Sequence, residues 1–462
     1  MRAASLGDES LTEEQMTASK STRNPLEERV VTAIEDGTDE LVRLASDLIA
    51  FDTTARLPGD PPRQERNLQE YLRDRLLELG AVVDLWEPEP TAPDDPFVPG
   101  GLTFDGRPQL LARLAGANGG RSLLLNGHID VVAPGPLEHW TEPPFMPHVR
   151  DGRLYGRGSC DMKGGIAAML FALVTLHRLG ISLAGDVVFC ADTDEESSGA
   201  GAYACVARGV QADAGLCAEP TGFDAWVACR GGVNPTITIE GRAAHAEMPQ
   251  PHWHAGGGVN AIEKLSLIFD ALRVVREDWR TRPDQRHPFL SPGDIVPTMV
   301  RGGEWIVTYP SSCELTLDVQ YGPGQVDAAG TGQAVFRELE ERVNRAVSAD
   351  SWLAQHPPRW SWPCDIVPAE IPADHPIVGE ALRAAADRGR PGKVAGLDSW
   401  HDPAVFIRRA RIPTISFGPG SIHAAHAPDE YVPIADLVDH AAAVALILLR
   451  WCGAAERSVY PH

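Results

Sequence analysis

The first part of the chain carries apolar residues at helical spacing. From Leu26 to Phe51 this spacing is interrupted near Gly37, which predicts one or two amphipathic helices. Another helix is predicted from Gln64 to Leu79, because the apolar pattern stops directly before Gly80, a usual residue just beyond a helix C-terminus. The chain therefore opens on helices before its first strand.

Short apolar runs that end in turn or acidic residues predict the strands of a sheet. They lie at Ala81–Trp86, Gln109–Leu114, Ser122–Leu125, Val187–Ala191, Ala214–Ala218 and Pro413–Phe417. An apolar stripe that follows Asp161 and closes at Gly180 predicts a helix between two of these strands. Alternating strands and helices indicate an α/β fold.

The pattern changes between Arg230 and Ile366, where strands and helices follow in the order strand, helix, strand, strand, helix, strand. These elements are predicted at Val233–Gly241, Asn260–Val275, Glu304–Tyr309, Ser312–Gln320, Val326–Val347 and Arg359–Pro363. This order predicts a ferredoxin-like α+β domain inserted into the first domain. The chain then returns to the first domain and ends in a helix predicted from Ile434 to Trp451.

A chain of 462 residues exceeds what one core usually supports, so two domains are expected. The start of the chain is rich in Glu, Ser and Thr and has no apolar h-region, which predicts a loose tail. We therefore predict a flexible tail at residues 1–24, a first domain made of residues 25–230 and 367–462, and an inserted domain at residues 231–366.

Composition and charge narrow the class of protein. The net charge of -23 disfavours nucleic acid or an anionic membrane as a partner, because both are held chiefly by Lys and Arg. The sequence contains no run of ~18 or more apolar residues, the length that would predict a membrane span. The eight cysteines are scattered without a C-x-x-C pair, which favours buried reduced thiols over disulfides or a thiolate zinc site. These features predict a cytoplasmic enzyme.

The apolar segment Leu123–Val132 ends on His128 and Asp130, where a metal site is expected. Ligands of open α/β sheets collect outside the carboxyl ends of the strands. Residues two apart in an extended chain point to the same side, and a carboxylate can hold an imidazole's tautomer while the other ring nitrogen binds a metal. An H-x-D triplet alone is a weak signal that is equally consistent with a polar loop.

Acidic and histidine residues recur after other strand-like runs, and this repetition strengthens the prediction. They are Asp161, Glu195, Glu196, Glu219 and His426. Taken singly, Asp161 could be a helix N-cap, and the stretch from Asp192 to Glu196 could be a solvated acidic patch. Together with His128 they match the mixed N/O ligand set of a two-zinc hydrolytic centre.

These motifs resemble those of the cocatalytic zinc deacylases and exopeptidases, a family that includes acetylornithine deacetylase, succinyl-diaminopimelate desuccinylase, aminoacylase and glutamate carboxypeptidase. The resemblance covers nearly the whole chain and lies chiefly in Gly127–Asp130, Gly156–Gly165, Asp194–Glu196, Ala218–Thr221 and Ala425–Glu430. It implies a zinc-exopeptidase-like catalytic domain with a central mixed sheet. It also implies that the inserted domain is a lid and dimerisation domain.

The resemblance further implies a role for each candidate residue. Asp161 would bridge two Zn²⁺ ions, for which Co²⁺ or Mn²⁺ can substitute, and the remaining ligands would be His128 and Glu219 on one ion and Glu196 and His426 on the other. Asp130 would support His128. Glu195 would be the general base, since a carboxylate that does not bind metal must take the proton of the water and pass it to the leaving nitrogen.

Three positions of the inserted domain bear on substrate and assembly. In the similar family, the histidine at the position of His245 reaches the partner subunit's active site and hydrogen-bonds the developing oxyanion, so we expect a homodimer. Val307 stands where relatives usually have Asn, and Gln320 stands where they have Arg. Both altered positions touch substrate in relatives.

These departures favour a small-molecule amide without a carboxylate. Arg supplies a bidentate fork that glutamine cannot replace, and valine offers no side-chain hydrogen bond. Trp400 could provide an apolar or stacking surface, whereas Arg230 or Arg301 could restore the missing charge. We expect an N-formyl or N-acyl amide whose leaving amine carries a ring, a formylated or acetylated heteroaromatic methylamine being one instance.

The predicted function is therefore that of a metal-dependent amidohydrolase, a deacylase acting on linear amides as acetylornithine deacetylase does. A dipeptidase or carboxypeptidase of the same family would use the same centre. A metal-binding regulatory protein that has lost activity is the non-enzymatic alternative, and the intact ligand set with a spare Glu195 argues against it.

Overall fold

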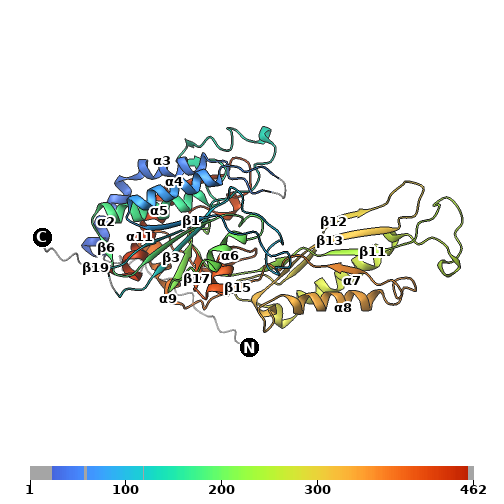
Figure 1. Cartoon of the computed structure of the whole chain (residues 1–462). Coiled ribbons are helices and arrows are strands. Elements are labelled where there is room, and N and C mark those ends of the chain that lie inside the picture. Colours follow the sequence, from blue (N-terminus) through green and yellow to red (C-terminus); the bar gives the residue numbers. More distant parts are fainter. Residues whose placement is uncertain (1–22, 57–59, 118, 456–462) are drawn as a thin grey trace, which may run out of the picture.

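The computed structural model describes residues 23–56, 60–117 and 119–455, and the predicted tail at residues 1–24 lies almost entirely outside them. Figure 1 shows two parts of this chain: a layered part built on a large sheet, and an elongated part that extends to one side of it.

The large sheet has nine strands, which mix parallel and antiparallel neighbours. They are β1 (Val82–Trp86), β2 (Gln109–Leu114), β3 (Leu123–His128), β7 (Val187–Asp192), β8 (Ala214–Cys217), β9 (Ala225–Cys229), β15 (Ala369–Glu370), β16 (Val394–Leu397) and β17 (Thr414–Ser416). Their order is β1-β2-β7-β3-β8-β17-β9-β15, and β16 also pairs with β9. β3 runs parallel to both β7 and β8, and β17 runs parallel to β8. The predicted α/β class with a central mixed sheet is confirmed.

Helices cover both faces of this sheet. The main core receives side chains from α2 (Pro25–Asp36), α3 (Thr38–Ile49), α4 (Glu65–Glu78), α5 (Lys163–Arg178), α9 (Pro376–Asp387) and α11 (Ile434–Trp451). A smaller cluster on the other face includes residues of α6 (Ala200–Ala207), α10 (Pro403–Val405) and η5 (Phe406–Ala410). Alternation along β3 assigns the faces, since Leu123 and Leu125 join the main core and Leu124 joins the smaller cluster.

The elongated part has its own sheet and its own hydrophobic core. Its strands are β10 (Gly231–Val233), β11 (Thr236–Glu240), β12 (Asp294–Gly302), β13 (Ser312–Tyr321) and β14 (Arg359–Ser361), in the order β10-β13-β11-β14 with β12 also paired to β13. The helices α7 (Ala261–Trp279) and α8 (Gln333–Val347) lie side by side along this sheet (Figure 1).

The strand predicted at Glu304–Tyr309 is wrong. These residues form the connection between β12 and β13, in which the Ile306 side chain is 92% exposed. The real strand, β12, escapes the apolar pattern because most of its residues are exposed at the sheet edge and because it contains Pro297. The following helix likewise begins at Gln333 rather than at Val326.

Smaller elements complete the described chain. A three-stranded sheet joins β4 (His148–Arg150), β5 (Arg153–Tyr155) and β18 (Tyr431–Pro433), and a two-stranded sheet pairs β6 (Ser182–Leu183) with β19 (Ala454–Ala455). Short 3-10 helices are η1 (Leu137–His139), η2 (Trp253–Ala255), η3 (Pro283–Gln285), η4 (Pro323–Gln325) and η6 (Ile422–Ala424). In the part of the chain that the structure describes, no helix has the length and apolar character needed to cross a membrane.

Candidate metal centre

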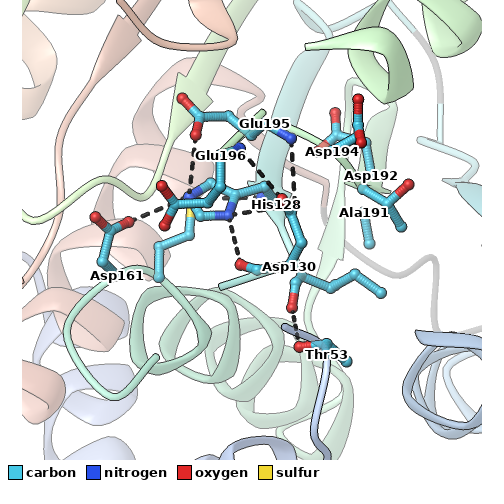
Figure 2. A network of polar contacts seen from close by, with 12 residues as sticks. Thr53, His128, Asp130, Asp161, Ala191, Asp192, Asp194, Glu195 and Glu196 are labelled. Carbon is cyan, nitrogen blue, oxygen red and sulfur yellow. Dashed lines mark hydrogen bonds and ion pairs between the residues drawn. The ribbon is translucent and has the colours of Figure 1, made fainter. Parts of the chain in front are cut away.

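Three parallel strands deliver the candidate residues to one edge of the large sheet. His128 is the last residue of β3, the loop with Glu195 and Glu196 follows β7, and Glu219 follows β8. Because β7, β3 and β8 are parallel neighbours, their carboxyl ends meet at the same edge. Figure 2 shows His128 with Asp161 and the two glutamates gathered around it.

Asp161 and His426 reach this edge from outside the large sheet. Asp161 precedes α5, and His426 precedes β18, which pairs with β5. Asp161 is not the helix N-cap, because Met162 occupies that position. Its carboxylate instead contacts His128 Nε2 at 3.1 Å and His426 Nε2 at 3.4 Å.

The remaining distances tie the group together. Glu196 lies 3.1 Å from His426 Nε2, whereas Glu219 and Glu195 lie 3.8 Å and 4.0 Å from His128 Nε2. One potential ligand atom each of His128, Asp161 and Glu196 lies within 4.8 Å of the others. The structure therefore brings six of the predicted residues together: His128, Asp161, Glu195, Glu196, Glu219 and His426.

Crowded carboxyl groups shift the protonation equilibria of this cluster. Burial raises the pKa of Glu195 well above its usual value, and burial together with the charge of Asp161 raises the pKa of Glu219 to about 8. Hydrogen bonds to Asp161 and Glu196 raise the pKa of His426 to about 10. The cluster thus has four carboxyl groups and only two histidines to balance them.

The donor set fits divalent cations. Among the described residues, no Lys or Arg forms an ion pair with any of the four carboxylates, although a buried charge normally has a partner or binds a metal. Histidine nitrogens and carboxylate oxygens are ligands that zinc accepts. The group can therefore hold metal ions that supply the missing positive charge.

Asp130 contacts both His128 and the glutamate loop. The backbone carbonyl of Asp130 lies 2.9 Å from His128 Nδ1, and its carboxylate lies farther from that nitrogen, at 3.7 Å. The carboxylate accepts hydrogen bonds from the backbone N–H groups of Glu195 and Glu196, at 3.3 and 3.1 Å (Figure 2). Asp130 therefore positions the loop as well as the imidazole.

Asp194 shapes this loop, a contribution that its motif alone does not reveal. Its backbone adopts the left-handed region with φ of 74°, and its carbonyl accepts hydrogen bonds from the N–H groups of Ser198 and Gly199. Its carboxylate pairs with the buried Arg107 at 2.7 Å. The turn lets adjacent glutamates make different contacts, since Glu196 approaches His426 while Glu195 approaches His128.

A buried ion pair supports Asp161, and its two residues lie in recognised motifs without a predicted role. Glu430 accepts hydrogen bonds from the backbone N–H groups of Cys160 and Asp161, at 2.8 and 3.0 Å. The same carboxylate pairs with Arg157, and both side chains are almost fully buried. Only the fold shows this contact, because 273 positions separate the two residues.

Arg157→Met is expected to lower the free energy of unfolding by about 3–5 kcal/mol, because it leaves the Glu430 carboxylate buried and unpaired. Denaturant unfolding measures this change. Arg113→Met is the matched control, since Arg113 pairs with Asp186 at the surface, where a pair contributes about 0–1 kcal/mol. Equal losses in the two variants would contradict a stabilising role for the buried pair.

The other predicted residues make no contact with the cluster within the described chain. His245 is exposed and forms an isolated β-bridge with Thr308. Val307 precedes Thr308 in the connection between β12 and β13. Gln320 lies in β13 and donates to Asp318. The ring of Trp400 packs beside Gly199 in the cluster around α6, so its described contacts are packing contacts.

Arg230 does not provide a free charge. Its guanidinium donates hydrogen bonds to the carbonyls of Asp398 and Pro292, and the residue is 9% exposed. Arg301 is exposed on β12.

Comparisons with known proteins match the region that carries the cluster. The family described as "Peptidase family M20/M25/M40" matches residues 124–450. The chain is similar to N-formyl-4-amino-5-aminomethyl-2-methylpyrimidine deformylase of Halalkalibacterium halodurans, with 31% identity over 92% of this chain and 97% of the relative. It is also similar to acetylornithine deacetylase of Proteus mirabilis, with 30% identity over 71% of this chain and 79% of the relative. Among solved structures, a tripeptidase from Staphylococcus aureus has the same fold, with a TM-score of 0.67 and 20% identity over 90% of this chain and 98% of that one.

Proposed function

The chain belongs to peptidase family M20/M25/M40, and on this premise we propose that it hydrolyses the N-formyl or N-acyl amide of a small amine that lacks a carboxylate. Membership confirms the resemblance predicted from the motifs, and with it the assignment to metal-dependent amide hydrolases. The observation that carries the proposal is the buried group of His128, Asp161 and Glu196 with Glu195 beside it.

We assign the cluster to two zinc ions, for which Co²⁺ or Mn²⁺ can substitute. Asp161 would be the ligand shared by the two ions, because its two carboxylate oxygens lie 3.1 and 3.4 Å from the two histidines. The other ligands are His128 and Glu219 on one side and Glu196 and His426 on the other. When bound, such ions lower the pKa of a water and polarise the amide carbonyl.

Glu195 is the residue that moves the proton in this proposal. Its carboxylate is close to His128 but, unlike that of Glu196, makes no contact with His426 among the described pairs. Burial raises its pKa, which suits a group that accepts a proton from water and then gives it to the leaving nitrogen. Asp130 holds the backbone of Glu195 in place during these transfers.

The substrate class follows from the inserted domain and from the relatives. Val307 and Gln320 replace the Asn and Arg that would bind a carboxylate, and Arg230 is already occupied by backbone carbonyls. The deformylase relative, which aligns over nearly the whole chain, is named for a formylated aminomethylpyrimidine. A formylated heteroaromatic methylamine therefore fits both observations.

An activity screen of the metal-loaded protein tests this proposal. We expect N-formyl and N-acetyl heteroaromatic methylamines to be hydrolysed with a kcat/KM at least about tenfold above that for N-acetylornithine, because the site lacks a charge-assisted partner for the carboxylate. Dipeptides serve as the comparison for a peptidase of the same family. Faster turnover of N-acetylornithine or of a dipeptide would contradict the inference, and no turnover of any amide would favour an inactive metal-binding protein.

We also propose a cytoplasmic homodimer in which residues 231–366 act as the lid and dimerisation domain. His245 lies between β11 and η2, where Ala246 donates to the Val307 carbonyl and Tyr309 donates to the Ala244 carbonyl, both at 2.8 Å. Since His245 has no described contact with the cluster of its own chain, it is expected to act on a second copy.

Mixing His245→Ala subunits with Glu195→Gln subunits is expected to restore part of the activity, because one composite site of each hybrid dimer regains both groups. Turnover after subunit exchange is the measurement, and each variant exchanged with itself is the control. If exchange is proven by mass spectrometry and no activity returns, then His245 does not act across the interface.

A further inference from the structure

A second group of side chains that could bind a metal ion lies in the core. Cys190 and Asp192 come from β7, Cys205 from α6, Asp402 from the start of α10 and Asn126 from β3. All five are at most 1% exposed, and the two cysteines lie on the sheet face that α6 covers. We call these five residues the thiol–carboxyl cluster.

The cluster contains an excess of hydrogen-bond acceptors. Asn126 Nδ2 donates to Asp192 Oδ2 at 3.0 Å, which directs the amide nitrogen and leaves Asn126 Oδ1 without a donor. Asp192 Oδ1 and both carboxylate oxygens of Asp402 also have no partner. Acceptors cannot satisfy one another, and each buried unpaired group costs about 1–3 kcal/mol or more when charged. A cation would resolve this imbalance.

The distances suit a tetrahedral zinc site. One potential ligand atom each of Cys190, Asp192 and Cys205 lies within 4.8 Å of the others, and Cys190 Sγ lies 3.7 Å from Asp192 Oδ2. Zinc–ligand bonds of the usual length put neighbouring tetrahedral ligands about 3.5–3.8 Å apart. The carboxyl group of Asp402 is buried beside that of Asp192 and is available as a fourth ligand.

We propose that Cys190, Asp192, Cys205 and Asp402 bind a structural zinc ion that is distinct from the dinuclear centre. The sequence spacing disfavoured a thiolate zinc site because the two cysteines are not in one motif, but the fold joins them from different elements. Asn126 then acts through Asp192 by orienting its carboxylate. The ion would join β7, which leads into the glutamate loop, to the helices that cover this face of the sheet.

The thiols need the cation in order to ionise. Burial raises the pKa of Cys190 well above its usual value and also raises that of Cys205. Zinc binding releases these thiol protons and leaves two thiolates on the ion. Because the cluster is sealed from solvent, the metal enters while the chain folds.

Cobalt grown into the protein in place of zinc provides the test. The dinuclear ligands are all nitrogen or oxygen, so a thiolate-to-cobalt charge-transfer band reports only a cysteine site. We expect this band in the wild-type protein. The Cys190→Ser, Cys205→Ser double variant should lose the band and should also lose one metal ion per chain. Asp161→Ala should keep the band. Cys217→Ser is the matched control, since Cys217 Sγ lies 3.8 Å from Glu219 of the dinuclear centre, and it should also keep the band.

X-ray absorption at the zinc edge of the wild-type protein needs no variant and remains informative if the serine variant does not fold. A sulfur shell at about 2.3 Å is expected. Absence of sulfur around zinc, or a band that survives the double substitution, would overturn the proposal. The proposal would also be overturned if intact mass spectrometry showed a disulfide between Cys190 and Cys205. A metal-free cluster in which the carboxyl groups share a proton would overturn it as well.

Discussion

Glu195→Gln is expected to lower kcat by at least about 10²-fold, the low end of what a positioned acid–base group supplies, while the metal content stays unchanged. Glutamine keeps the volume and the backbone N–H that Asp130 holds, but its amide cannot take a proton from water. Steady-state kinetics and elemental analysis of the same preparation measure both quantities. Glu28→Gln, an exposed change on α2, is the matched control and should leave both unchanged.

Two outcomes would contradict this assignment in different ways. Near-normal kcat would remove Glu195 as the proton carrier. Loss of a metal ion would make Glu195 a ligand, and the spare carboxylate would then have to be Glu196. The distances favour Glu195 as the carboxylate that does not bind metal, because Glu196 lies 3.1 Å from His426 whereas Glu195 lies 4.0 Å from His128.

The grouping of the candidate residues could be predicted because several of them stand at the carboxyl ends of strands, which the apolar pattern locates. His128 closes β3, Glu219 follows β8, and the two glutamates follow β7. The fold then brings these ends together whatever the loop details are, since the three strands are parallel neighbours. The grouping of these side chains therefore follows from pattern and motif together.

The residues that hold the cluster could not be predicted in the same way. Arg157 and Glu430 pair across most of the chain length, and Arg107 meets Asp194 only after β2 and β7 have paired. Such contacts depend on tertiary packing, which has no local sequence signal. The edge strand β12 escapes prediction for a related reason, because an exposed strand needs no apolar alternation.

Substrate contacts lie still farther from what one chain reveals. His245 and Val307 lie in neighbouring segments of the inserted domain, and neither forms a described hydrogen bond or ion pair with the cluster. If a second copy completes the site, the residues that act on it are exposed in the single chain and make no contact with the cluster of their own chain. The subunit-mixing and screening experiments test these contacts directly.

Asp161→Ala is expected to remove both ions of the dinuclear centre and to lower turnover more than Glu195→Gln does. Its carboxylate is the only one that contacts both His128 and His426 among the described ion pairs, so its loss takes a ligand from each ion at once. Elemental analysis and kcat are the measurements, with Asp84→Ala as control, since the Asp84 carboxylate on β1 pairs with Arg208 away from the cluster. Asp161→Asn separates charge from volume, because a neutral amide is a poor bridge between two cations. Retention of both ions by Asp161→Ala would refute the bridging role and would leave the two histidines in separate sites.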